Sequence, residues 1–288
     1  MGKYKRFYDY KEYIKKNLKE LKVIYTDLDG TLLNDKGCLV KDWRSDYYLG
    51  VIKQLEKISK KNWDIVLVSG RNKVQLKYNA QFIGVKNYIA ELGSELVYDL
   101  GKKVFVTFDN KKYHYDLTYK SKDLLDIIKL FKEKFPGKID SNMKWSINRS
   151  YNALFFGEID LDLANKILED NGYSGLILVD NGFSSLVDLD INVKKLHIYN
   201  LLPYGVNKSN GVKLDKKIRN LKRKNCIALG DSVEDLKIAK EVQFFFLMRD
   251  AIEHNRDILN ILSELDNVYV TEGYMNRGWV EVMEFLAD

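Results

Sequence analysis

The sequence predicts an α/β protein with a parallel-sheet core and an inserted α+β module. Two apolar β-prone stretches, 22–26 and 63–68, flank a stretch over 46–60 in which apolar residues recur at three-residue steps. Strand, helix and strand in this order form a βαβ unit, and such units build parallel sheets with right-handed crossovers. Over residues 104–203 strands instead come in pairs beside single helices, which is typical of an antiparallel sheet covered on one face.

The same patterns predict the remaining elements of a Rossmann-like core, residues 1–103 and 204–288, and of the insert, residues 104–203. In the core, we expect extended segments over 88–100, 226–229 and 243–247, and helices over 3–20, 72–83, 211–223, 233–240 and from Trp279. In the insert, we expect helices over 122–135 and 161–170, and strands over 104–108, 152–156, 176–179, 186–189 and 196–201. The buried face of helix 46–60 is expected to carry Leu49, Ile52, Leu55 and Ile58.

Length and composition fit a globular protein with ample material for a core. Of the 288 residues, 45% are apolar and 31% are charged, and no apolar run approaches the ~18 residues that span a bilayer. The N-terminus lacks the apolar segment of a secretory signal, and the two cysteines, Cys38 and Cys226, lie far apart in the sequence. We therefore expect a soluble cytoplasmic protein without a disulfide framework.

The net charge of +6 arises from 47 basic residues spread along the chain beside 41 acidic ones. Short basic clusters, such as Lys15-Lys16 and residues 222–224, fall on predicted helices, where a solvated face explains them. The charge therefore gives no strong reason to expect a nucleic-acid partner. A mildly positive field would help to attract an anionic substrate.

An Asp-x-Asp-Gly-Thr motif follows the first strand, with carboxylates at Asp27 and Asp29, a glycine at Gly30 and a hydroxyl at Thr31. In a parallel sheet, ligands bind outside the carboxyl ends of the strands, so these carboxylates are placed for chemistry. Asp-x-Asp-Gly is also an ordinary turn, because Asp bonds its own backbone and Gly adopts a positive φ. The motif alone leaves both interpretations open.

Polar groups elsewhere in the core favour chemistry over a simple turn. The second strand ends at Ser69, a later strand ends at Asp231 with Asp235 four residues on, and Lys208 lies in a loop between them. Clustered carboxylates repel one another and need a cation, and an all-oxygen site favours Mg²⁺. A carboxylate can also attack phosphorus, while a metal, a lysine and hydroxyl groups stabilise the transferring oxygens. The set therefore indicates phosphoryl transfer.

Taken in order, these motifs resemble the four motifs of the haloacid dehalogenase-like superfamily of phosphohydrolases. The position of the insert, between the second and third motifs, resembles that of the class IIB cap of Cof-type phosphatases. The resemblance implies that Asp27 is the nucleophile and a Mg²⁺ ligand. It also implies that Asp29 is the general acid and base, with its backbone carbonyl facing the metal.

The resemblance assigns roles to the other motif residues as well. Thr31, Ser69 and Lys208 would bind the phosphoryl oxygens, and Asp231 would bind Mg²⁺. Asp235 would lie behind these groups and orient Lys208 or a metal-bound water. Simpler explanations remain for some of them, since Ser69 also suits a turn, Lys208 a solvated loop and Asp235 a helix surface.

Two departures from the family pattern bear on the substrate more than on the reaction. Glu234 stands where Cof-type sequences usually have Asn, and it could accept a supporting hydrogen bond or add charge to the metal site. The usual Glu-Asn-Gly after the second motif is here Glu91-Leu92-Gly93, which removes an amide near the substrate. Residues 196–209 and Gly278-Trp279 resemble the mannosyl-3-phosphoglycerate phosphatase branch most, and the general architecture also resembles that of sucrose-phosphate and trehalose-phosphate phosphatases.

The cap is expected to supply specificity by closing over the active site. Lys144, Asn148 and Arg149 are its best-suited contacts for an anion or a hydroxyl, although a polar strand edge explains them equally well. Arg71, which follows Ser69-Gly70, is expected either to bridge core elements or to face the substrate.

The predicted protein is a Mg²⁺-dependent phosphatase that forms an aspartyl-phosphate and acts on a phosphorylated sugar or a mannosyl-3-phosphoglycerate-like metabolite. The first alternative is a phosphomutase of the phosphomannomutase type, which would require a bisphosphate and yield a sugar phosphate. The second is a non-enzymatic module that binds anions or nucleic acid. Salt-sensitive binding of DNA or RNA without phosphatase activity would favour this alternative. An insert of about 100 residues argues against a receiver-like module, which is typically of single-domain size.

Overall fold

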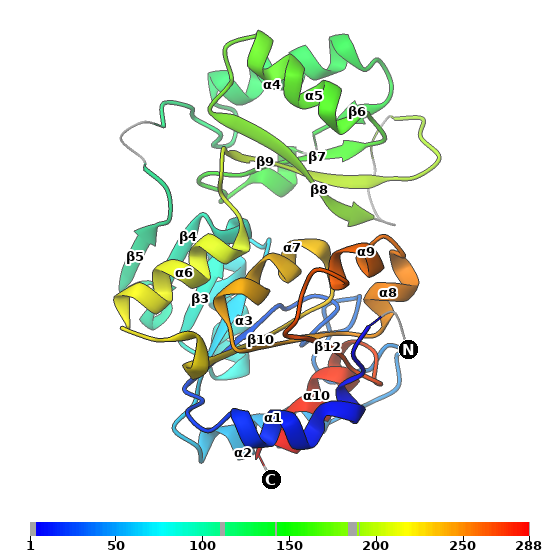
Figure 1. Ribbon diagram of the computed structural model, residues 1–288. Helices are drawn as coiled ribbons and strands as arrows, with labels where there is room; N and C mark the ends of the chain where they lie inside the picture. Colours follow the sequence, from blue (N-terminus) through cyan, green and yellow to red (C-terminus); the bar gives the residue numbers. More distant parts are fainter. Residues whose placement is uncertain (1–3, 110–112, 142, 184–188, 190, 288) are drawn as a thin grey trace.

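The protein is built from two sheets stacked one above the other, with the larger sheet in the lower part (Figure 1). The computed structural model describes residues 4–109, 113–141, 143–183, 189 and 191–287. The strands of the larger sheet are β1 (Val23–Thr26), β2 (Asp64–Val68), β3 (Asn87–Ala90), β4 (Glu95–Tyr98), β5 (Lys103–Val106), β10 (Cys226–Gly230), β11 (Phe244–Leu247) and β12 (Val268–Val270). Their order is β12-β11-β10-β1-β2-β3-β4-β5, in which β4 and β5 are antiparallel to their neighbours and the others are parallel.

Helices cover both faces of this sheet, which confirms the predicted Rossmann-like α/β core. One face packs against η1 (Phe7–Tyr10), α1 (Lys11–Asn17), α2 (Gly50–Ser59), α3 (Lys73–Ile83) and α10 (Met275–Ala287). The other packs against α6 (Lys208–Ile218), α7 (Val233–Leu236), η6 (Lys237–Glu241), α8 (Asp250–His254) and α9 (Ile258–Leu262). Short 3₁₀ turns occur at η2 (Glu91–Gly93), η3 (Asp99–Gly101) and η5 (Arg223–Asn225).

Alternation along the central strands fills two hydrophobic cores. On β1, Ile24 joins one core while Val23 and Tyr25 join the other, because successive side chains point to opposite faces. The predicted buried face of the helix over 46–60 was right for Leu55 and Ile58, which pack in the core, and wrong for Leu49 and Ile52, which are exposed. Val51 is buried instead, because the interface with the sheet follows the 3.6-residue helical period rather than a strict three-residue step.

The smaller sheet belongs to the segment between β5 and α6, which we call the cap (residues 113–203). Its strands are β6 (Ile139–Asp140), β7 (Ala153–Gly157), β8 (Leu176–Phe183) and β9 (His197–Pro203), in the antiparallel order β6-β7-β9-β8. Helices α4 (Lys122–Lys134) and α5 (Leu161–Asp170) cover the outer face, and the sheet lies toward the core (Figure 1). The predicted antiparallel sheet covered on one face is therefore present, with a further 3₁₀ turn at η4 (Met143–Ser146).

Some predictions need correction or lie outside the described residues. The strand expected at 104–108 as part of the insert is β5, which pairs with β4 at the edge of the larger sheet, so the expected boundary at residue 103/104 falls inside a core strand. Of the strand expected over 186–189, only residue 189 is described. The short elements β6, β12, α8 and α9 were missed because a few residues show no clear period.

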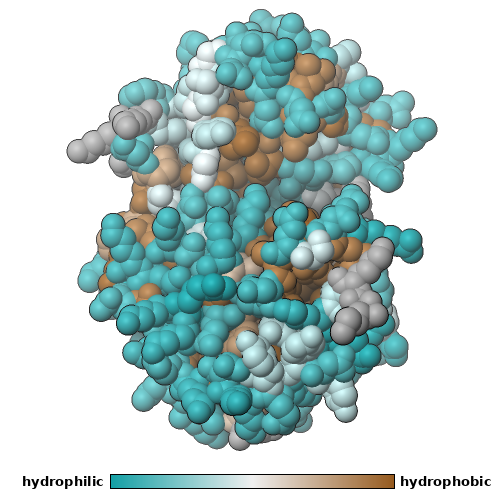
Figure 2. All heavy atoms as spheres, in the orientation of Figure 1, coloured by the Kyte–Doolittle hydropathy of each residue, from teal (hydrophilic) through white to brown (hydrophobic). Residues whose placement is uncertain are grey.

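The N-terminal segment packs on the core, as predicted. Phe7 and Ile14 are buried in it, and the Val270 amide of the edge strand β12 donates to the Lys5 carbonyl at 2.9 Å. A bridge between Arg6 and Val270 continues this pairing. No helix within the described parts of the chain is long and apolar enough to cross a bilayer. Hydrophilic side chains cover most of the lower part in Figure 2, and apolar ones reach the surface near the middle of the molecule.

Candidate active site

The sheet order brings the predicted motif residues to one edge. Strand β1 lies between β2 and β10, and all three are parallel with closely matched registers. Asp27, Ser69 and Asp231 each follow directly after one of these strands. The three carboxyl ends therefore meet, as the sequence predicts.

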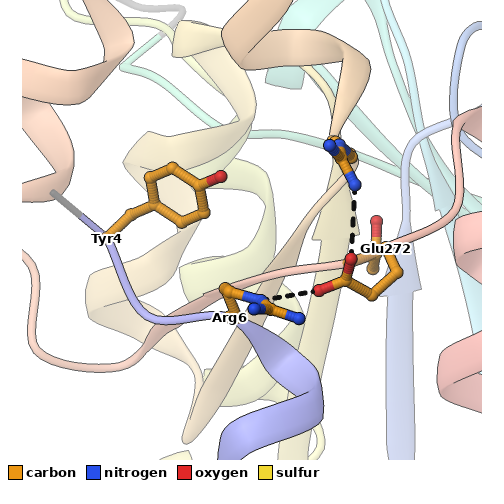
Figure 3. A pocket seen from close by; sticks show the side chains of 5 residues that line it. Tyr4, Arg6 and Glu272 are labelled. Atoms are coloured by element: carbon orange, nitrogen blue, oxygen red, sulfur yellow. Dashed lines mark hydrogen bonds and ion pairs between the residues drawn. The ribbon is translucent and has the colours of Figure 1, made fainter. Parts of the chain in front are cut away.

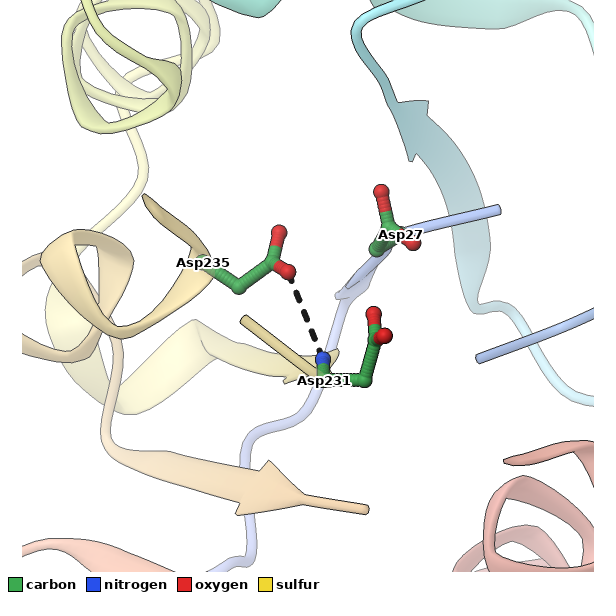
Figure 4. A group of neighbouring side chains, drawn as sticks. All are labelled: Asp27, Asp231 and Asp235. Carbon is green, nitrogen blue, oxygen red and sulfur yellow. Dashed lines mark hydrogen bonds between the residues drawn. The ribbon is translucent and has the colours of Figure 1, made fainter. Parts of the chain in front are cut away.

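Three carboxylates form a cluster at this edge. Oxygens of Asp27, Asp231 and Asp235 lie within 4.8 Å of one another, and Figure 4 shows the side chains gathered around a common space. Asp235 is fully buried and accepts hydrogen bonds from the Ser232 hydroxyl at 2.6 Å and from the backbone amides of Ser232 and Asp231. These bonds fix Asp235 behind the other two carboxylates.

Lys208 joins this cluster from the first residue of α6. Its Nζ donates to Asp27 Oδ1 at 2.6 Å and to Asp235 Oδ1 at 2.7 Å, and only 4% of the residue is exposed. The helix begins here because the Asn207 side chain accepts the Asn210 amide. Burial acts to lower the pKa of Lys208, but the two carboxylates outweigh it and raise that pKa above its ordinary value.

The cluster has more negative than positive charge. Burial raises the pKa of Asp27 to about 7, even though Lys208 acts to lower it. Burial, with repulsion from Asp27 and Asp235, raises the pKa of Asp231 well above its ordinary value. Three carboxylates facing one ammonium group, with oxygen as the donor atom throughout, fit a divalent cation, which would supply the missing positive charge.

The Gly-Thr part of the first motif is shaped to contact Asp231. Gly30 has a φ of +79°, and a Cβ at this position would lie 2.4 Å from Asp231 Oδ2, so no larger residue fits. The Thr31 hydroxyl, fully buried, donates to Asp231 Oδ1 at 3.1 Å. The turn and the chemical interpretation of the motif are therefore compatible, because the turn itself brings these groups to Asp231.

Asp29 is held away from the three-carboxylate cluster by Arg71. Arg71 Nε donates to Asp29 Oδ2 at 2.8 Å and Nη2 donates to Oδ1 at 2.5 Å, while Nη1 donates to the Asn79 side chain at 3.1 Å. Arg71 thus bridges core elements, which is one of its two expected positions. A carboxylate held at both oxygens has a defined orientation.

Ser69 and Glu234 support the loops around the cluster. Ser69 is buried, and its hydroxyl oxygen accepts the Arg71 amide at 3.2 Å. Glu234 Oε1 accepts the Lys208 backbone amide at 3.2 Å, and its other oxygen pairs with Lys237 at 2.5 Å. Glu234, which replaces the usual Asn, therefore still accepts a hydrogen bond from the lysine loop.

Comparison with known proteins gives the family. The model of the haloacid dehalogenase-like hydrolases matches residues 24–267. The chain belongs to this family. Within it, the chain is 25% identical over 251 residues to a glucosyl-3-phosphoglycerate/mannosyl-3-phosphoglycerate phosphatase of Persephonella marina, with 78% of this chain and 84% of the relative covered. It is 26% identical over 223 residues to a phosphoglycolate phosphatase of Metallosphaera sedula, with 77% and 82% covered.

Solved structures show that the fold of this chain is shared with known proteins. The sucrose-phosphatase of Synechocystis, determined with sucrose and phosphate, has a TM-score of 0.63 at 14% identity and covers 93% of this chain and 98% of its own. A haloacid dehalogenase-like hydrolase of Bacteroides thetaiotaomicron has a TM-score of 0.61 at 16% identity, with 92% and 99% covered. The predicted family, fold class and enzyme class, a phosphatase of the haloacid dehalogenase type, are confirmed.

The predicted cap contacts differ in environment from one another. Lys144 and Asn148 are exposed, whereas Arg149 is buried and donates from Nη1 to the Gly70 carbonyl of the core at 2.9 Å. A cap residue that the sequence did not indicate also approaches this loop. A Cβ placed on Gly70 would lie 3.6 Å from the Asn181 side-chain nitrogen. The β8 strand of the cap therefore contacts the core at Gly70, next to Ser69.

Sequence reasoning also missed Asp215, a fully buried carboxylate on the helix that begins with Lys208. It accepts hydrogen bonds from the hydroxyls of Tyr25 and Tyr98 and lies 3.3 Å from Arg219 Nε. The two tyrosines come from β1 and β4, more than 100 residues away in the sequence, so no local pattern could have revealed these bonds. Asp215 fixes α6 against the sheet and thereby supports the position of Lys208.

A separate cavity of about 230 Å³ lies beside the N-terminal segment and shares no residue with the acidic cluster (Figure 3). Arg6 and Arg249 both line it, and each donates to Glu272, at 2.9 and 3.2 Å. Because both guanidinium groups already bind a carboxylate, the cavity offers little free positive charge to an anion.

Proposed function

We propose that this enzyme is a Mg²⁺-dependent phosphatase that hydrolyses a small phosphorylated metabolite through an aspartyl-phosphate on Asp27. The observation that carries the proposal is the meeting of Asp27, Asp231 and Lys208 at the carboxyl edge of the sheet, beside Ser69 and Thr31. This arrangement offers a nucleophile, a cation site and donors for phosphoryl oxygens in one place.

In the first step, a carboxylate oxygen of Asp27 attacks phosphorus and the bond from phosphorus to the leaving oxygen breaks. Asp29 gives its proton to that oxygen, which requires it to release one of its bonds to Arg71. In the second step, Asp29 takes a proton from water, whose oxygen attacks phosphorus and frees Asp27. In both steps the Lys208 ammonium group neutralises charge on the phosphoryl oxygens, and the hydroxyls of Ser69 and Thr31 donate hydrogen bonds to them.

Asp27 and Asp231 would hold the Mg²⁺, together with the Asp29 backbone carbonyl. When bound, the ion supplies positive charge to the transferring oxygens and lowers the cost of burying the carboxylates. Asp235 is committed to Lys208 and to backbone amides, and we assign it the supporting role expected from the sequence.

Mg²⁺ at about 100 times its dissociation constant is expected to stabilise the chelator-treated protein by about 2.7 kcal/mol, because it binds the folded state alone. Calorimetry or a dye-based thermal shift measures this without any assay of activity. In Asp231→Asn the Mg²⁺-induced shift should vanish, because one partly buried ligand loses its charge. An unchanged shift in that variant would place the ion elsewhere.

The substrate we propose is a phosphorylated sugar or a glycosyl-phosphoglycerate, a class that includes what the Persephonella marina relative is named for. The test is phosphate release from a panel containing mannosyl- and glucosyl-3-phosphoglycerate, phosphoglycolate, sucrose-6-phosphate and hexose phosphates, with and without Mg²⁺. One strongly preferred substrate, lost on chelation, is the expected result. No release from any substrate would contradict the proposal.

Arg71→Lys is expected to lower kcat by about tenfold or more, because a lysine cannot hold both oxygens of Asp29 and the acid loses its orientation. Steady-state phosphate release measures the effect. Asn79→Ala is the matched control, since it removes only the bond on the far side of Arg71. A kcat within twofold of wild type in Arg71→Lys would show that Asp29 does not depend on this pair.

A further inference from the structure

We propose that Glu91 is a positioning residue that fastens the cap to the loop carrying Ser69, through the backbone of residues 147–151, which we call the docking segment. The proposal deepens the proposed function, since it concerns how the cap and the phosphate-binding loop of the same site are joined. Glu91 lies in the η2 turn of the core, and the docking segment lies between η4 and β7 of the cap.

On the cap side, the hydrogen bonds described for the Glu91 carboxylate all come from backbone amides. One oxygen accepts the Ser150 amide at 2.9 Å, and the other accepts the Tyr151 amide at 2.9 Å and that of Ser150 at 3.1 Å. Glu91 is fully buried. Burying a carboxylate costs free energy unless the group accepts hydrogen bonds. Here the donors belong to the cap, so contact with the cap supplies the hydrogen bonds that this core carboxylate needs.

On the core side, the same turn is tied to the phosphate-binding loop. The Glu91 amide donates to the Arg71 carbonyl at 3.0 Å and the Leu92 amide to the Ser69 carbonyl at 3.1 Å. Glu91 and Leu92 have φ values of +51° and +55°, in the left-handed region that is uncommon for residues other than glycine. Such strained residues persist where the surroundings hold them, and they concentrate at functional sites.

The turn also touches the loop that leads into Lys208. A Cβ on Gly93 would lie 2.0 Å from the Asn207 carbonyl oxygen, so the two backbones are in direct contact. The η2 turn therefore lies against the Ser69 loop, the Lys208 loop and the cap. A displacement of this turn would disturb two groups that we assign to phosphate binding.

Arg149 completes the connection from the cap back to the core. Its guanidinium donates to the Gly70 carbonyl at 2.9 Å and to the Trp145 carbonyl at 3.2 Å, and it attracts the Glu91 carboxylate. Arg149 is 8% exposed. Two buried groups of opposite charge thus lie at the interface. Arg149, from the cap, bonds a carbonyl of the core, and Glu91, from the core, bonds backbone amides of the cap.

Lys73 adds a more exposed contact to the same interface. Its ammonium group donates to the Ser150 hydroxyl at 3.0 Å and to Glu95 at 2.9 Å. Glu95 is buried on β4, and among the described residues it bonds the Lys73 side chain and not the docking-segment backbone. Glu95 is therefore a matched control for Glu91: a buried carboxylate at the same interface without the proposed role.

The test is hydrogen exchange on the unaltered chain and on Glu91→Gln, in which one of the two acceptor oxygens becomes an NH₂ donor and the negative charge is lost, so that the three bonds from the cap amides are reduced in number and in strength. Exchange at Ser150 and Tyr151 is expected to rise at least about tenfold, with a smaller rise over residues 70–72, while α2 and α10 on the far face stay unchanged. In Glu95→Gln the exchange of the docking segment is expected to stay within about twofold. Equal effects of the two variants, or a uniform rise across the protein, would overturn the proposal.

Phosphate release provides a second readout, in which Glu91→Gln should lower kcat about tenfold and leave the Mg²⁺-induced thermal shift unchanged. If Glu91→Gln does not fold, Arg149→Met tests the same connection from the cap side, and raised exchange at residues 70–72 is then expected. Unchanged exchange there would contradict the proposal. The exchange result stands whether or not any substrate is turned over, so failure of the proposed phosphatase activity remains distinguishable from failure of the docking role.

Discussion

Asp27→Asn is expected to lower kcat at least about a thousandfold, because the amide cannot attack phosphorus and no other carboxylate takes its place. The fold should survive. Burial already raises the pKa of Asp27 to about 7, so a neutral side chain of the same shape costs little there. Its Oδ1 can still accept from Lys208, which also keeps its bond to Asp235. Phosphate release and a thermal melt measure the two effects separately.

The control for this variant is Asp64→Asn. Asp64 is the first residue of β2, so it lies at the amino ends of the central strands, opposite the active site, and it pairs there with Arg219. This substitution removes a strand-end carboxylate of the same core and should leave kcat within about twofold of wild type. Substantial activity in Asp27→Asn, or an equal loss in Asp64→Asn, would remove Asp27 from the role of nucleophile.

Lys208→Met is expected to lower both stability and activity. Removing one partner of a buried ion pair leaves uncompensated charge, which costs about 3–5 kcal/mol in unfolding free energy. Loss of the ammonium group that neutralises phosphoryl oxygens should lower kcat by about a hundredfold or more. Denaturant unfolding and phosphate release are the measurements.

The pH dependence of this destabilisation has a definite sign. Lys208 acts to lower the pKa of Asp27, so its removal raises that pKa beyond about 7. A carboxyl whose pKa is higher in the folded than in the unfolded state favours folding when it is protonated. The stability lost in Lys208→Met should therefore be largest above the raised pKa and shrink as the pH falls to about 7, below which Asp27 is protonated in both folded proteins.

Lys216→Met serves as the matched control. Lys216 lies on the same helix and pairs with Glu241 at 3.0 Å, at a site that is also largely buried. We expect a smaller loss of stability and no change in kcat. If Lys216→Met reduced kcat as strongly as Lys208→Met, the activity loss would reflect the helix and not the ammonium group at Asp27.

The parts of this molecule that the sequence predicts well are those governed by local pattern. Strand β1 and the turn at Gly30 follow from an apolar run that ends in Asp-x-Asp-Gly, and sheet topology then brings Ser69 and Asp231 to the same edge. Order along the chain was therefore enough to predict which polar groups meet.

Features that depend on contacts between distant segments could not be predicted in this way. Asp215 is held by tyrosines on two strands, and Glu91 by two backbone amides about 60 residues later in the chain. Neither a carboxylate nor a main-chain amide carries a sequence signal for such a pairing. The strand at β5 was assigned to the wrong part for a related reason, since its pattern does not reveal which sheet it joins.

The two edge strands of the larger sheet, β12 and β5, differ in how well they are protected from pairing with another strand. At β12, Val270 is already paired with the N-terminal segment through Lys5, which shields that edge from another strand. At β5, Val104 and Phe105 are 45% and 36% exposed, and the neighbouring Lys102 and Lys103 oppose strand addition. A partly unfolded or concentrated sample of this protein would therefore begin to aggregate through β5, and charge added at Val104 would be the direct way to suppress it.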